Sequence, residues 1–339
     1  MKMLHIADLA ADHQRMLSPP MVAALRELGD LTILSDGRWM TENEISALIR
    51  DCDILLTGWG SVMTPDCIAD DRGNLKYICN LTGTMRLYVK PRHIAAGIPV
   101  TNWGDSIAPS VAEGAVALLF AVLKNIRPLG KLVEAGFWSD GSQVRQTSLD
   151  RLRVGIYGMG AIGRKFVEYI TPYNPVLSGY DPYVDAGFWP DSVRRVEGLD
   201  ALFEDIDALV IHAGLSDETR NTVNAERLAK LPNHGVIINT ARGGIIDQDA
   251  LMAELRSGRL RAGIDVLDSP LYGDELSIND PARFYPNLTL TCHWVSGSSW
   301  PVREEVNEWQ QAAIDNIKRF IAGEPLLYTM DLDRYERST

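Results

Sequence analysis

Short apolar runs alternate with longer amphipathic stretches over the first hundred residues. The apolar runs predict buried strands at 3–7, 31–34, 54–57, 75–79 and 99–101. The stretches between them predict helices at 20–28, 41–50, 65–69 and 91–96, and several of these have a proline near the start. Because strands and helices alternate, the pattern predicts a parallel sheet with helices on both faces.

The rest of the chain repeats this alternation after one long helix. An apolar helix is predicted from about Ser110 to Ile126, and the last helix from near Pro301 to about Ile321. The buried strands predicted between them lie at 154–157, 176–180, 208–212, 236–239, 263–266 and 288–292. This arrangement is typical of a second, doubly wound α/β domain that begins at Arg153.

The first strand of this second domain runs into a glycine-rich turn. The turn reads Gly158-x-Gly160-x-x-Gly163 and opens a helix, and the next strand ends in Asp181, 18 residues past Gly163. This is the dinucleotide fingerprint, because the glycines permit a tight turn, close approach of a pyrophosphate and close helix packing. Asp181 suits the two ribose hydroxyls and would repel a 2′-phosphate, so we expect NAD as the cofactor.

Composition narrows the class of protein further. The chain has 339 residues, of which 46% are hydrophobic and 23% charged, as expected for a globular protein of two domains. We expect no membrane span and no secretory signal, because apolar runs are short and an acid follows the first strand. A net charge of −12 argues against a nucleic-acid partner. The four cysteines lack metal or redox spacing, which favours a cytoplasmic location and no metal site.

Several segments around and after the turn carry a resemblance to a known family. They read Asn-Thr-Ala-Arg-Gly-Gly around Arg242, Gly-Ile-Asp-Val around Asp265, and Thr-Cys-His-Trp-Val-Ser-Gly-Ser around His293. Another segment runs from His212 to Thr219. With the fingerprint in the middle of the chain, they resemble the D-isomer-specific 2-hydroxyacid dehydrogenases over nearly the whole sequence.

The resemblance implies a fold and an assembly. In this family both chain ends form the substrate domain and the middle forms the cofactor domain. We therefore expect a substrate domain of residues 1–107 and 300–339 and an NAD-binding Rossmann domain of residues 108–299. The fold class is α/β, with a Rossmann-type doubly wound cofactor domain inserted into a flavodoxin-like parallel-sheet substrate domain. Members are usually homodimers that pair through the cofactor domains and the long helix after Pro109.

Arg242 and His293 are the predicted catalytic residues. A 2-oxo acid needs its carboxylate held and its carbonyl polarised, and a guanidinium offers paired donors with a permanent charge. An imidazole titrates near neutral pH, so His293 is expected to donate a proton in reduction and accept one in oxidation. A surface ion pair for Arg242 and a structural role for His293 are the alternatives.

The resemblance also implies binding residues for substrate and cofactor. Those expected to bind the substrate are Thr82, Gly83, Thr84, Arg242 and His293. Those expected to bind NAD are Gly158, Gly160, Ala161, Ile162, Gly163, Asp181, His212, Thr219, Thr240, Ala241, Arg242, Asp265, His293 and Ser296. Asp265 is expected to accept a hydrogen bond from the nicotinamide carboxamide, the alternative being an acid that caps a turn.

One position departs from the family pattern in a way that bears on catalysis. The family usually has a glutamate that binds the catalytic histidine, and here that position is Pro270. Asp268, Asp274 or Glu275 are possible replacements, with Asp268 preferred. Because a neighbouring carboxylate favours the imidazolium, its loss predicts a reduction rate that falls at lower pH than is usual for the family.

Other departures concern the loops expected to touch the substrate. Met85 replaces a glycine and Arg86 follows it, which suggests an unusual substrate, although an exposed arginine is the simpler interpretation. The tryptophans expected in or near these loops, as an aromatic wall or as interface residues, are Trp59, Trp294 and Trp300. Cys292 replaces a proline and is expected to be a packing residue and not a nucleophile.

The sequence therefore predicts an NAD-dependent enzyme that interconverts a small 2-oxo acid and its D-2-hydroxy acid, in a cleft between domains that closes to exclude water. One alternative is an NAD(H)-binding regulator of the corepressor kind, with little turnover. Another is a formate or phosphite dehydrogenase, but that group pairs its histidine with a glutamine that Pro270 does not supply.

Overall fold

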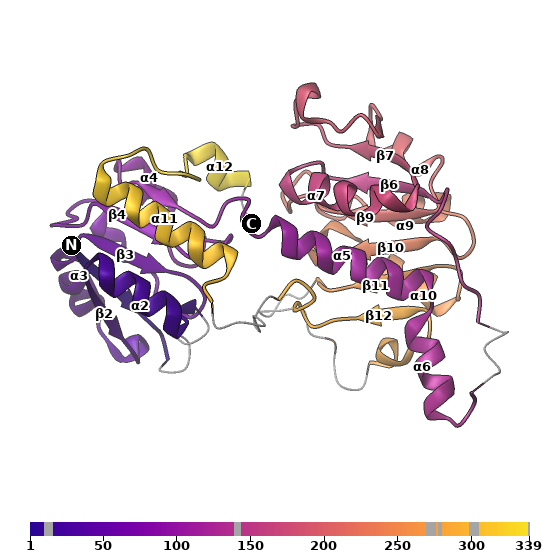
Figure 1. Ribbon diagram of the computed structural model, residues 1–339, viewed down its shortest axis with the longest axis horizontal. Coiled ribbons are helices and arrows are strands. Elements are labelled where there is room, and N and C mark those ends of the chain that lie inside the picture. The colour runs from indigo at the N-terminus through magenta and orange to yellow at the C-terminus, as the bar shows by residue number, and fades with distance from the viewer. Residues whose placement is uncertain (10–15, 139–143, 269–275, 277–279, 298–304, 338–339) are drawn as a thin grey trace. The chain divides into compact units, whose positions relative to one another are not determined.

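Two parallel β-sheets, each in its own unit of the chain, organise the computed structural model (Figure 1). The structure describes all residues except 10–15, 139–143, 269–275, 277–279, 298–304 and 338–339. One unit comprises residues 1–107 and 298–339, and the other comprises residues 108–297. The family of folds predicted from the pattern of apolar runs, two α/β units with parallel sheets, is confirmed.

The sheet of the first unit has the strand order β2-β1-β3-β4-β5, which is the flavodoxin-like order. Its strands are β1 (Lys2–Ile6), β2 (Asp30–Leu34), β3 (Ile54–Thr57), β4 (Tyr77–Asn80) and β5 (Val100–Thr101). Its helices are α2 (Pro19–Leu28), α3 (Glu42–Asp51), α4 (Pro91–Ala95), α11 (Glu308–Ala322) and α12 (Leu332–Arg337). The C-terminal segment therefore returns to this unit, where α11 packs beside α2 (Figure 1).

Successive side chains along each strand of this sheet belong to two separate hydrophobic cores, one on each face. Leu4 and Leu55 belong to the cluster that includes α3, whereas Met3 and Leu56 belong to the cluster that includes α2 and α11. Because successive residues of a strand point to opposite faces, continuous apolar strands need helices on both faces. This explains why the strands were visible in the sequence as uninterrupted apolar runs.

The sheet of the second unit has the order β12-β11-β10-β9-β6-β7-β8. Its strands are β6 (Arg153–Tyr157), β7 (Val176–Tyr180), β8 (Val193–Arg195), β9 (Ala208–Ile211), β10 (Val236–Asn239), β11 (Arg261–Ile264) and β12 (Leu288–Leu290). Counted from β6, this is the 3-2-1-4-5-6 order of the Rossmann fold with one more strand at the end. The order reverses between β6 and β9, and ligands of such sheets bind at the carboxyl ends of the strands near that point.

Helices cover both faces of this second sheet (Figure 1). The helices are α5 (Ala108–Leu123), α6 (Ile126–Glu134), α7 (Ala161–Ile170), α8 (Leu199–Phe203), α9 (Ala225–Lys230) and α10 (Gln248–Arg256). One core contains α5 and α7, and the other contains α8, α9 and α10. No single helix among the described residues is long and apolar enough to cross a membrane, although the bent pair α5 and α6 passes on length and composition alone.

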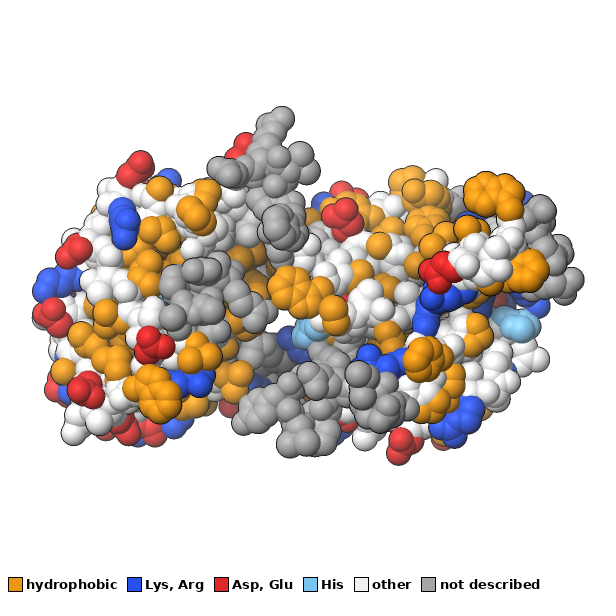
Figure 2. All heavy atoms as spheres, turned by 90° about the horizontal axis from the view of Figure 1, so that it is seen from below, with side chains coloured by type: hydrophobic (Ala, Val, Ile, Leu, Met, Phe, Trp, Pro, Cys, Tyr) orange, Lys and Arg blue, Asp and Glu red, His pale blue; other side chains and the backbone are white. Residues whose placement is uncertain are grey.

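Charged and apolar side chains are mixed on the face of the molecule shown in Figure 2. Lysine and arginine side chains are interspersed there with aspartate and glutamate side chains. Many charged residues of the described chain form exposed ion pairs, such as Lys2 with Asp51 and Arg92 with Asp70. Pairs of this kind are worth at most about 1 kcal/mol each, so the apolar cores supply most of the stability.

Two predicted elements differ from the structure, and one strand was not predicted. The helix predicted at 65–69 is a short 3₁₀ turn, Asp66–Ile68. The helix predicted from near Pro301 is α11, which begins at Glu308, because Asn307 caps it and Gln310 completes a capping box. The strand β8 was not predicted, since its Val-Arg-Arg sequence is short and polar and it pairs only with β7 at the edge of the sheet.

Candidate active site

The dinucleotide turn lies at the carboxyl end of β6, where the strand order reverses. Gly158 has a φ of +99°, which residues with a side chain rarely adopt. A Cβ at Gly158 would also lie 2.4 Å from the Ala213 nitrogen, and a Cβ at Gly163 would lie 2.1 Å from the Gly158 oxygen. Both glycines are therefore needed for the turn to pack against the helix and the neighbouring strand.

The start of α7 is built to receive phosphates. Gly160 is its N-cap, and no side chain caps the first turn of the helix. A Cβ at Gly160 would meet no atom within 4 Å, so the backbone faces open space. The first N–H groups of Ala161 and its neighbours can therefore bind a pyrophosphate, as helix N-termini do. This cradle fits a dinucleotide.

Asp181 follows β7 and is held in place by backbone groups. Its Oδ2 accepts a hydrogen bond from the Met159 nitrogen at 2.8 Å. Its Oδ1 accepts from the nitrogens of Tyr183 at 2.8 Å and Val184 at 3.2 Å. The carboxylate is thus fixed beside the glycine turn, and each oxygen keeps acceptor capacity for a ribose hydroxyl.

His212 follows β9 and lies behind the same turn. Its ring is buried 5.1 Å from the ring of Phe166, and neither ring nitrogen has a hydrogen-bond partner among the described residues. Burial lowers the pKa of His212 to about 3, so the imidazole is neutral in the folded protein. The buried Thr240 hydroxyl, which follows β10, also lacks a partner in the described part of the chain. Such unpaired buried groups are uncommon and mark this edge of the sheet.

One residue predicted to bind NAD, Thr219, has a side-chain hydroxyl that is already hydrogen-bonded within the protein. The Thr219 hydroxyl donates to the Gly214 oxygen at 2.7 Å and accepts from the Ser216 nitrogen at 2.8 Å. Thr219 therefore closes a local turn, and a contact of its side chain with the cofactor stays a prediction. Ala241 and Ser296 are partly exposed, in the loops that follow β10 and β12.

Arg242 is carried by a turn that Asn239 and Gly243 fix. The Asn239 side chain accepts a hydrogen bond from the Ala241 nitrogen at 3.0 Å and donates to the Arg242 oxygen at 2.9 Å. A Cβ at Gly243 would lie 2.0 Å from the Leu267 carbonyl carbon, so only glycine lets the two loops approach this closely. Sequence reasoning gave Asn239 no role, although an asparagine at the end of a strand is a typical turn signal.

Asp265 holds the loop that carries His293. Its Oδ1 accepts hydrogen bonds from the Thr291 hydroxyl at 2.5 Å, the Trp294 nitrogen at 3.1 Å and the Val295 nitrogen at 3.3 Å. Its backbone oxygen accepts from the His293 nitrogen at 3.0 Å. The turn-capping role is therefore present, while Oδ2 accepts no hydrogen bond from a described residue. A contact of Oδ2 with the carboxamide stays a prediction.

His293 has an unusual backbone conformation. Its φ is +58°, in the left-handed region that costs a residue with a side chain about 1–3 kcal/mol. The hydrogen bonds to Asp265 on either side of it offset this cost. The side chain is exposed, and such strained residues cluster at functional sites.

Arg242, Asp265 and His293 follow three adjacent parallel strands. Asn239 of β10 is in register with Ile264 of β11, and Ile264 is in register with Leu290 of β12. The three loops therefore leave the same edge of the sheet, which also carries the glycine turn and Asp181. The structure thus brings together, within one unit, the residues predicted for hydride and proton transfer.

The departures from the family pattern around His293 have mixed outcomes. Pro270, Asp274 and Glu275 lie outside the described residues. The Asp268 carboxylate lies 3.6 Å from Nη1 of Arg220, beside Gly244, so the structure shows it as an ion-pair partner of that arginine. Cys292 is exposed, so the structure does not support the expectation that it is a packing residue. Cys52 and Cys79, by contrast, are buried in the core of the first unit.

In the first unit, the loop predicted to bind substrate is rigidly held. Asn80 donates hydrogen bonds to the Thr82 oxygen at 2.7 Å and the Thr84 oxygen at 3.3 Å. The Thr82 hydroxyl is buried and donates to the Thr84 oxygen at 2.8 Å. A Cβ at Gly83 would lie 2.5 Å from Nε1 of Trp103, so this glycine is required for close packing. The side chain of Thr82 thus shapes the loop.

The side chains that flank this loop are placed differently from one another. Met85 is fully buried in the core of the first unit, so the prediction that it adds bulk at the substrate is not supported. Arg86 is exposed and lies over the ring of Tyr335, as the simpler interpretation expected. Trp59 is exposed and makes an edge contact with Trp103, their ring centres 5.6 Å apart. An aromatic surface therefore adjoins the loop.

Two of the tryptophans predicted to lie near the substrate follow His293, and the structure describes one of them. Trp294 is exposed in the loop after β12, next to His293. Trp300 lies outside the described residues. Whether these rings contact substrate stays a prediction.

Comparison with known proteins decides the family. Residues 116–294 match the model of the D-isomer specific 2-hydroxyacid dehydrogenase NAD-binding domain. The chain belongs to this family. A hydroxypyruvate reductase of Thermotoga maritima is 30% identical over 240 residues, which cover 70% of this chain and 76% of that protein.

Two further relatives extend the match. A D-3-phosphoglycerate dehydrogenase of Methanocaldococcus jannaschii is 28% identical over 310 residues, which cover 89% of this chain but only 56% of that protein. The solved structure of an NAD-dependent formate dehydrogenase from Staphylococcus aureus with NAD matches with a TM-score of 0.71 and 26% identity, over 96% of this chain and 97% of that one. The chain is an NAD-dependent oxidoreductase of the D-2-hydroxyacid dehydrogenase family, and its cofactor is NAD.

Proposed function

We propose that this enzyme interconverts a small 2-oxo acid and its D-2-hydroxy acid, with Arg242 binding the substrate carboxylate and His293 moving the proton. One observation carries the proposal. Arg242 and His293 follow β10 and β12, on either side of Asp265, at the sheet edge that holds the glycine turn. A cation and an acid–base group thus leave the same edge as the dinucleotide cradle.

In the proposed reaction, the cofactor and three residues each have a separate role. NAD, when bound, supplies the acceptor or donor of a hydride. In reduction His293 donates a proton to the carbonyl oxygen of the substrate, and in oxidation it takes the proton back. The guanidinium of Arg242 holds the carboxylate with paired hydrogen bonds and polarises the carbonyl. Asp265 fixes the loop that presents the imidazole.

The loop of Thr82, Gly83 and Thr84 is proposed as a second contact for the carboxylate. The hydroxyl of Thr82 already donates a hydrogen bond within the loop, and we propose that the backbone N–H groups of Gly83 and Thr84 make this contact. Asn80 and Trp103 give the loop a fixed shape, which favours binding because little ordering is needed.

The proposal is tested by NADH oxidation with glyoxylate, hydroxypyruvate, pyruvate, 2-oxobutyrate and phenylpyruvate. His293→Ala should lower kcat by about 10²–10⁴-fold, the usual contribution of general acid–base catalysis. His234→Ala is the matched control, because His234 is also exposed and also has a positive φ, of +66°. The control should keep full activity.

Arg242→Gln separates binding from proton transfer. Loss of the guanidinium should raise KM for the 2-oxo acid and lower kcat, because both the carboxylate contact and the carbonyl polarisation are removed. NADH binding, followed by fluorescence, should fall less than turnover in both variants, because the glycine turn and Asp181 are unchanged. Turnover that survives His293→Ala and Arg242→Gln would contradict the assigned roles, and absence of turnover with every substrate would contradict the proposed reaction.

A further inference from the structure

The loops after β7 and β9 lie on either side of the glycine turn. Tyr157 ends β6, and it is in register with Tyr180 of β7 on one side and with Ile211 of β9 on the other. The three strands therefore end level with one another, and the glycine turn leaves the middle strand. Because neighbouring strands are about 5 Å apart, β7 and β9 end about 10 Å apart. A dinucleotide binds across the crevice at this edge of such a sheet.

One hydrogen bond joins these two loops. The hydroxyl of Tyr183, in the loop after β7, donates to the carboxylate of Glu218, in the loop after β9. Since β6 lies between β7 and β9, the bond spans the carboxyl end of β6, where the glycine turn begins. The hydrogen bond also raises the pKa of Tyr183, so the phenol stays protonated and remains a donor at neutral pH.

The loop that carries Tyr183 is attached to the carboxylate expected to bind the ribose. The Tyr183 nitrogen donates to Oδ1 of Asp181 at 2.8 Å, and the Met159 nitrogen donates to Oδ2 of the same residue at 2.8 Å. The side chain of Tyr183 is 60% exposed, so packing in the core does not fix its position. The bond to Glu218 therefore decides where the phenol lies.

The turn that carries Glu218 is held by contacts of its own. The Thr219 hydroxyl donates to the Gly214 oxygen at 2.7 Å within this loop. The Asn221 nitrogen donates to the Gly244 oxygen at 2.8 Å, which ties the same loop to the one after β10. Glu218 is thus a fixed acceptor, and the Tyr183 side chain is the part that can move.

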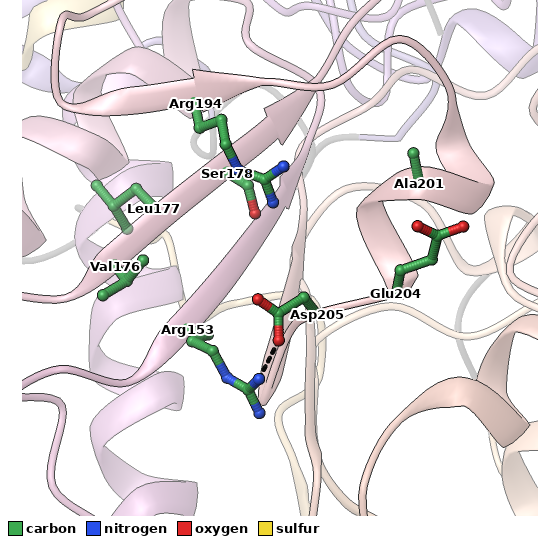
Figure 3. Close-up of a pocket in the computed structure, with 8 residues that line it drawn as sticks. All are labelled: Arg153, Val176, Leu177, Ser178, Arg194, Ala201, Glu204 and Asp205. Carbon is green, nitrogen blue, oxygen red and sulfur yellow. Dashed lines mark hydrogen bonds and ion pairs between the residues drawn. The ribbon is translucent and has the colours of Figure 1, made fainter.

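The strands beneath the two loops are tied together at their opposite ends. Arg153, at the start of β6, forms ion pairs with Asp205 and Asp207, which lie just before β9 (Figure 3). The Asp207 nitrogen also donates to the Arg153 oxygen at 2.8 Å. β6 and β9 cannot separate without breaking these contacts. Access to the crevice is therefore controlled by the loops at the carboxyl edge and not by movement of the strands.

We propose that Tyr183 and Glu218 form a clasp that retains the adenosine half of NAD. With its ribose on Asp181, the adenosine lies between the two loops that the clasp joins. The cofactor then leaves only after the hydrogen bond between Tyr183 and Glu218 breaks, so the clasp slows dissociation. The inference rests on NAD as the cofactor and on Asp181 as the ribose ligand. It does not depend on the substrate or on the roles proposed for Arg242 and His293.

The test is the rate of NADH dissociation, measured without substrate. NADH is displaced from the full-length protein by excess NAD in a stopped-flow experiment and followed by its fluorescence. Tyr183→Phe removes only the hydroxyl, and Glu218→Ala removes the acceptor. Each should raise the dissociation rate by about three- to tenfold, as expected for one exposed hydrogen bond to a charged group. ADP-ribose, which has the adenosine half without the nicotinamide, should lose affinity by the same factor as NADH.

A double variant and two controls separate a clasp from a general loosening of the loops. Tyr183→Phe with Glu218→Ala should release NADH no faster than the faster single variant, because both changes remove one bond. Tyr173→Phe is one control, since this tyrosine is 50% exposed but precedes β7, at the other edge of the sheet. Asp217→Ala is the other, since Asp217 is the exposed acid next to Glu218. Both controls should release NADH at the wild-type rate.

Three results would overturn the proposal. The first is an unchanged dissociation rate in Tyr183→Phe. The second is tighter binding of ADP-ribose by that variant, which would mean that the bond occupies the space of the nucleotide. The third is a double variant whose effect equals the product of the two single effects, because the two side chains would then act independently.

Discussion

At the scale of single residues, the candidate site depends on polar groups that fix backbone and not only on those that face a ligand. Asn239 and Asp265 each hold the loop that carries a predicted catalytic residue. His212 is a different case, because its buried ring has no described partner for either nitrogen. An imidazole in such a place is neutral in the folded protein, so the stability of the protein should depend on pH.

His212 should make the protein less stable as the pH falls. Its folded pKa of about 3 lies below the ordinary histidine pKa of 6.5, so between these values the unfolded chain binds more protons than the folded one. The free energy of unfolding should therefore fall by roughly 1.4 kcal/mol per pH unit below pH 6.5 on account of this residue. Above pH 6.5 the residue should have no effect of this kind.

His212→Leu tests this, because leucine is apolar and cannot be protonated. Urea denaturation of both proteins at several pH values from 7.5 to about 4.5 gives the free energies of unfolding. The difference between variant and wild type should be constant above pH 6.5 and should shift in favour of the variant below it. A difference that does not depend on pH would show that the ring is protonated in the folded state or is not buried.

At the scale of elements, the turn after β10 is the most tightly packed part of the site. A Cβ at Gly243 would lie 2.0 Å from backbone of the loop after β11. Gly243→Ala must therefore push the two loops apart, and this should cost about 1–3 kcal/mol of stability or more. Arg242 is the preceding residue, and a displacement of about 1 Å can lower catalysis by about 10²-fold.

The matched control is Gly187→Ala, because a Cβ at Gly187 would meet no atom within 4 Å. Melting temperature and kcat/KM are measured for both variants. Gly243→Ala should lower both quantities, and Gly187→Ala should leave both close to wild type. Equal behaviour of the two alanine variants would mean that the loops after β10 and β11 do not make this close approach.

Elements were predictable where local sequence decides them. The strands β3, β7 and β10 were predicted at their observed bounds, and β3 and β10 are buried at every position. β8 was missed because an edge strand of three residues owes its existence to pairing with β7. The start of α11 was misplaced because Pro301 was preferred to the capping box of Asn307 and Gln310.

The candidate site was predictable in its residue types and not in its supporting contacts. The turn at Gly158 and the loop of Arg242 could be inferred because their motifs are continuous in sequence. The hydrogen bonds from Trp294 and Val295 to Asp265 join segments about thirty residues apart, and no local pattern encodes them. Exposure of Cys292 was likewise decided by the shape of that loop.

At the scale of the whole molecule, the apolar helix after Pro109 is largely buried in its own unit, as its composition suggested. α5 buries Leu118, Leu119 and Leu123 in the core of its own unit, together with α7. Its apolar character is therefore explained within one chain. α6, which follows it, has no buried residue, yet it is strongly amphipathic.

The predicted homodimer should therefore use α6 and the segment after it. Ile126 and Val133 lie two turns apart on one side of α6 and are 59% and 50% exposed, and Phe137 and Trp138 beyond the helix are exposed as well. Monomeric proteins rarely expose contiguous apolar patches of more than a few hundred Å² unless they bind a partner. A second copy of the chain is the partner that the family resemblance implies.

Sedimentation analysis of wild type and of Val133→Asp tests this prediction. A charge placed in an apolar interface loses its hydration without gaining a partner, so Val133→Asp should convert a dimer to a monomer. Glu134→Gln is the control, because Glu134 is the next residue and its only described partner is Lys131 on the exposed surface of the same helix. A wild-type monomer, or a Val133→Asp dimer as stable as the control, would show that α6 is not the interface. If the prediction holds, the apolar residues of α5 stabilise the fold of one chain and those of α6 join two chains.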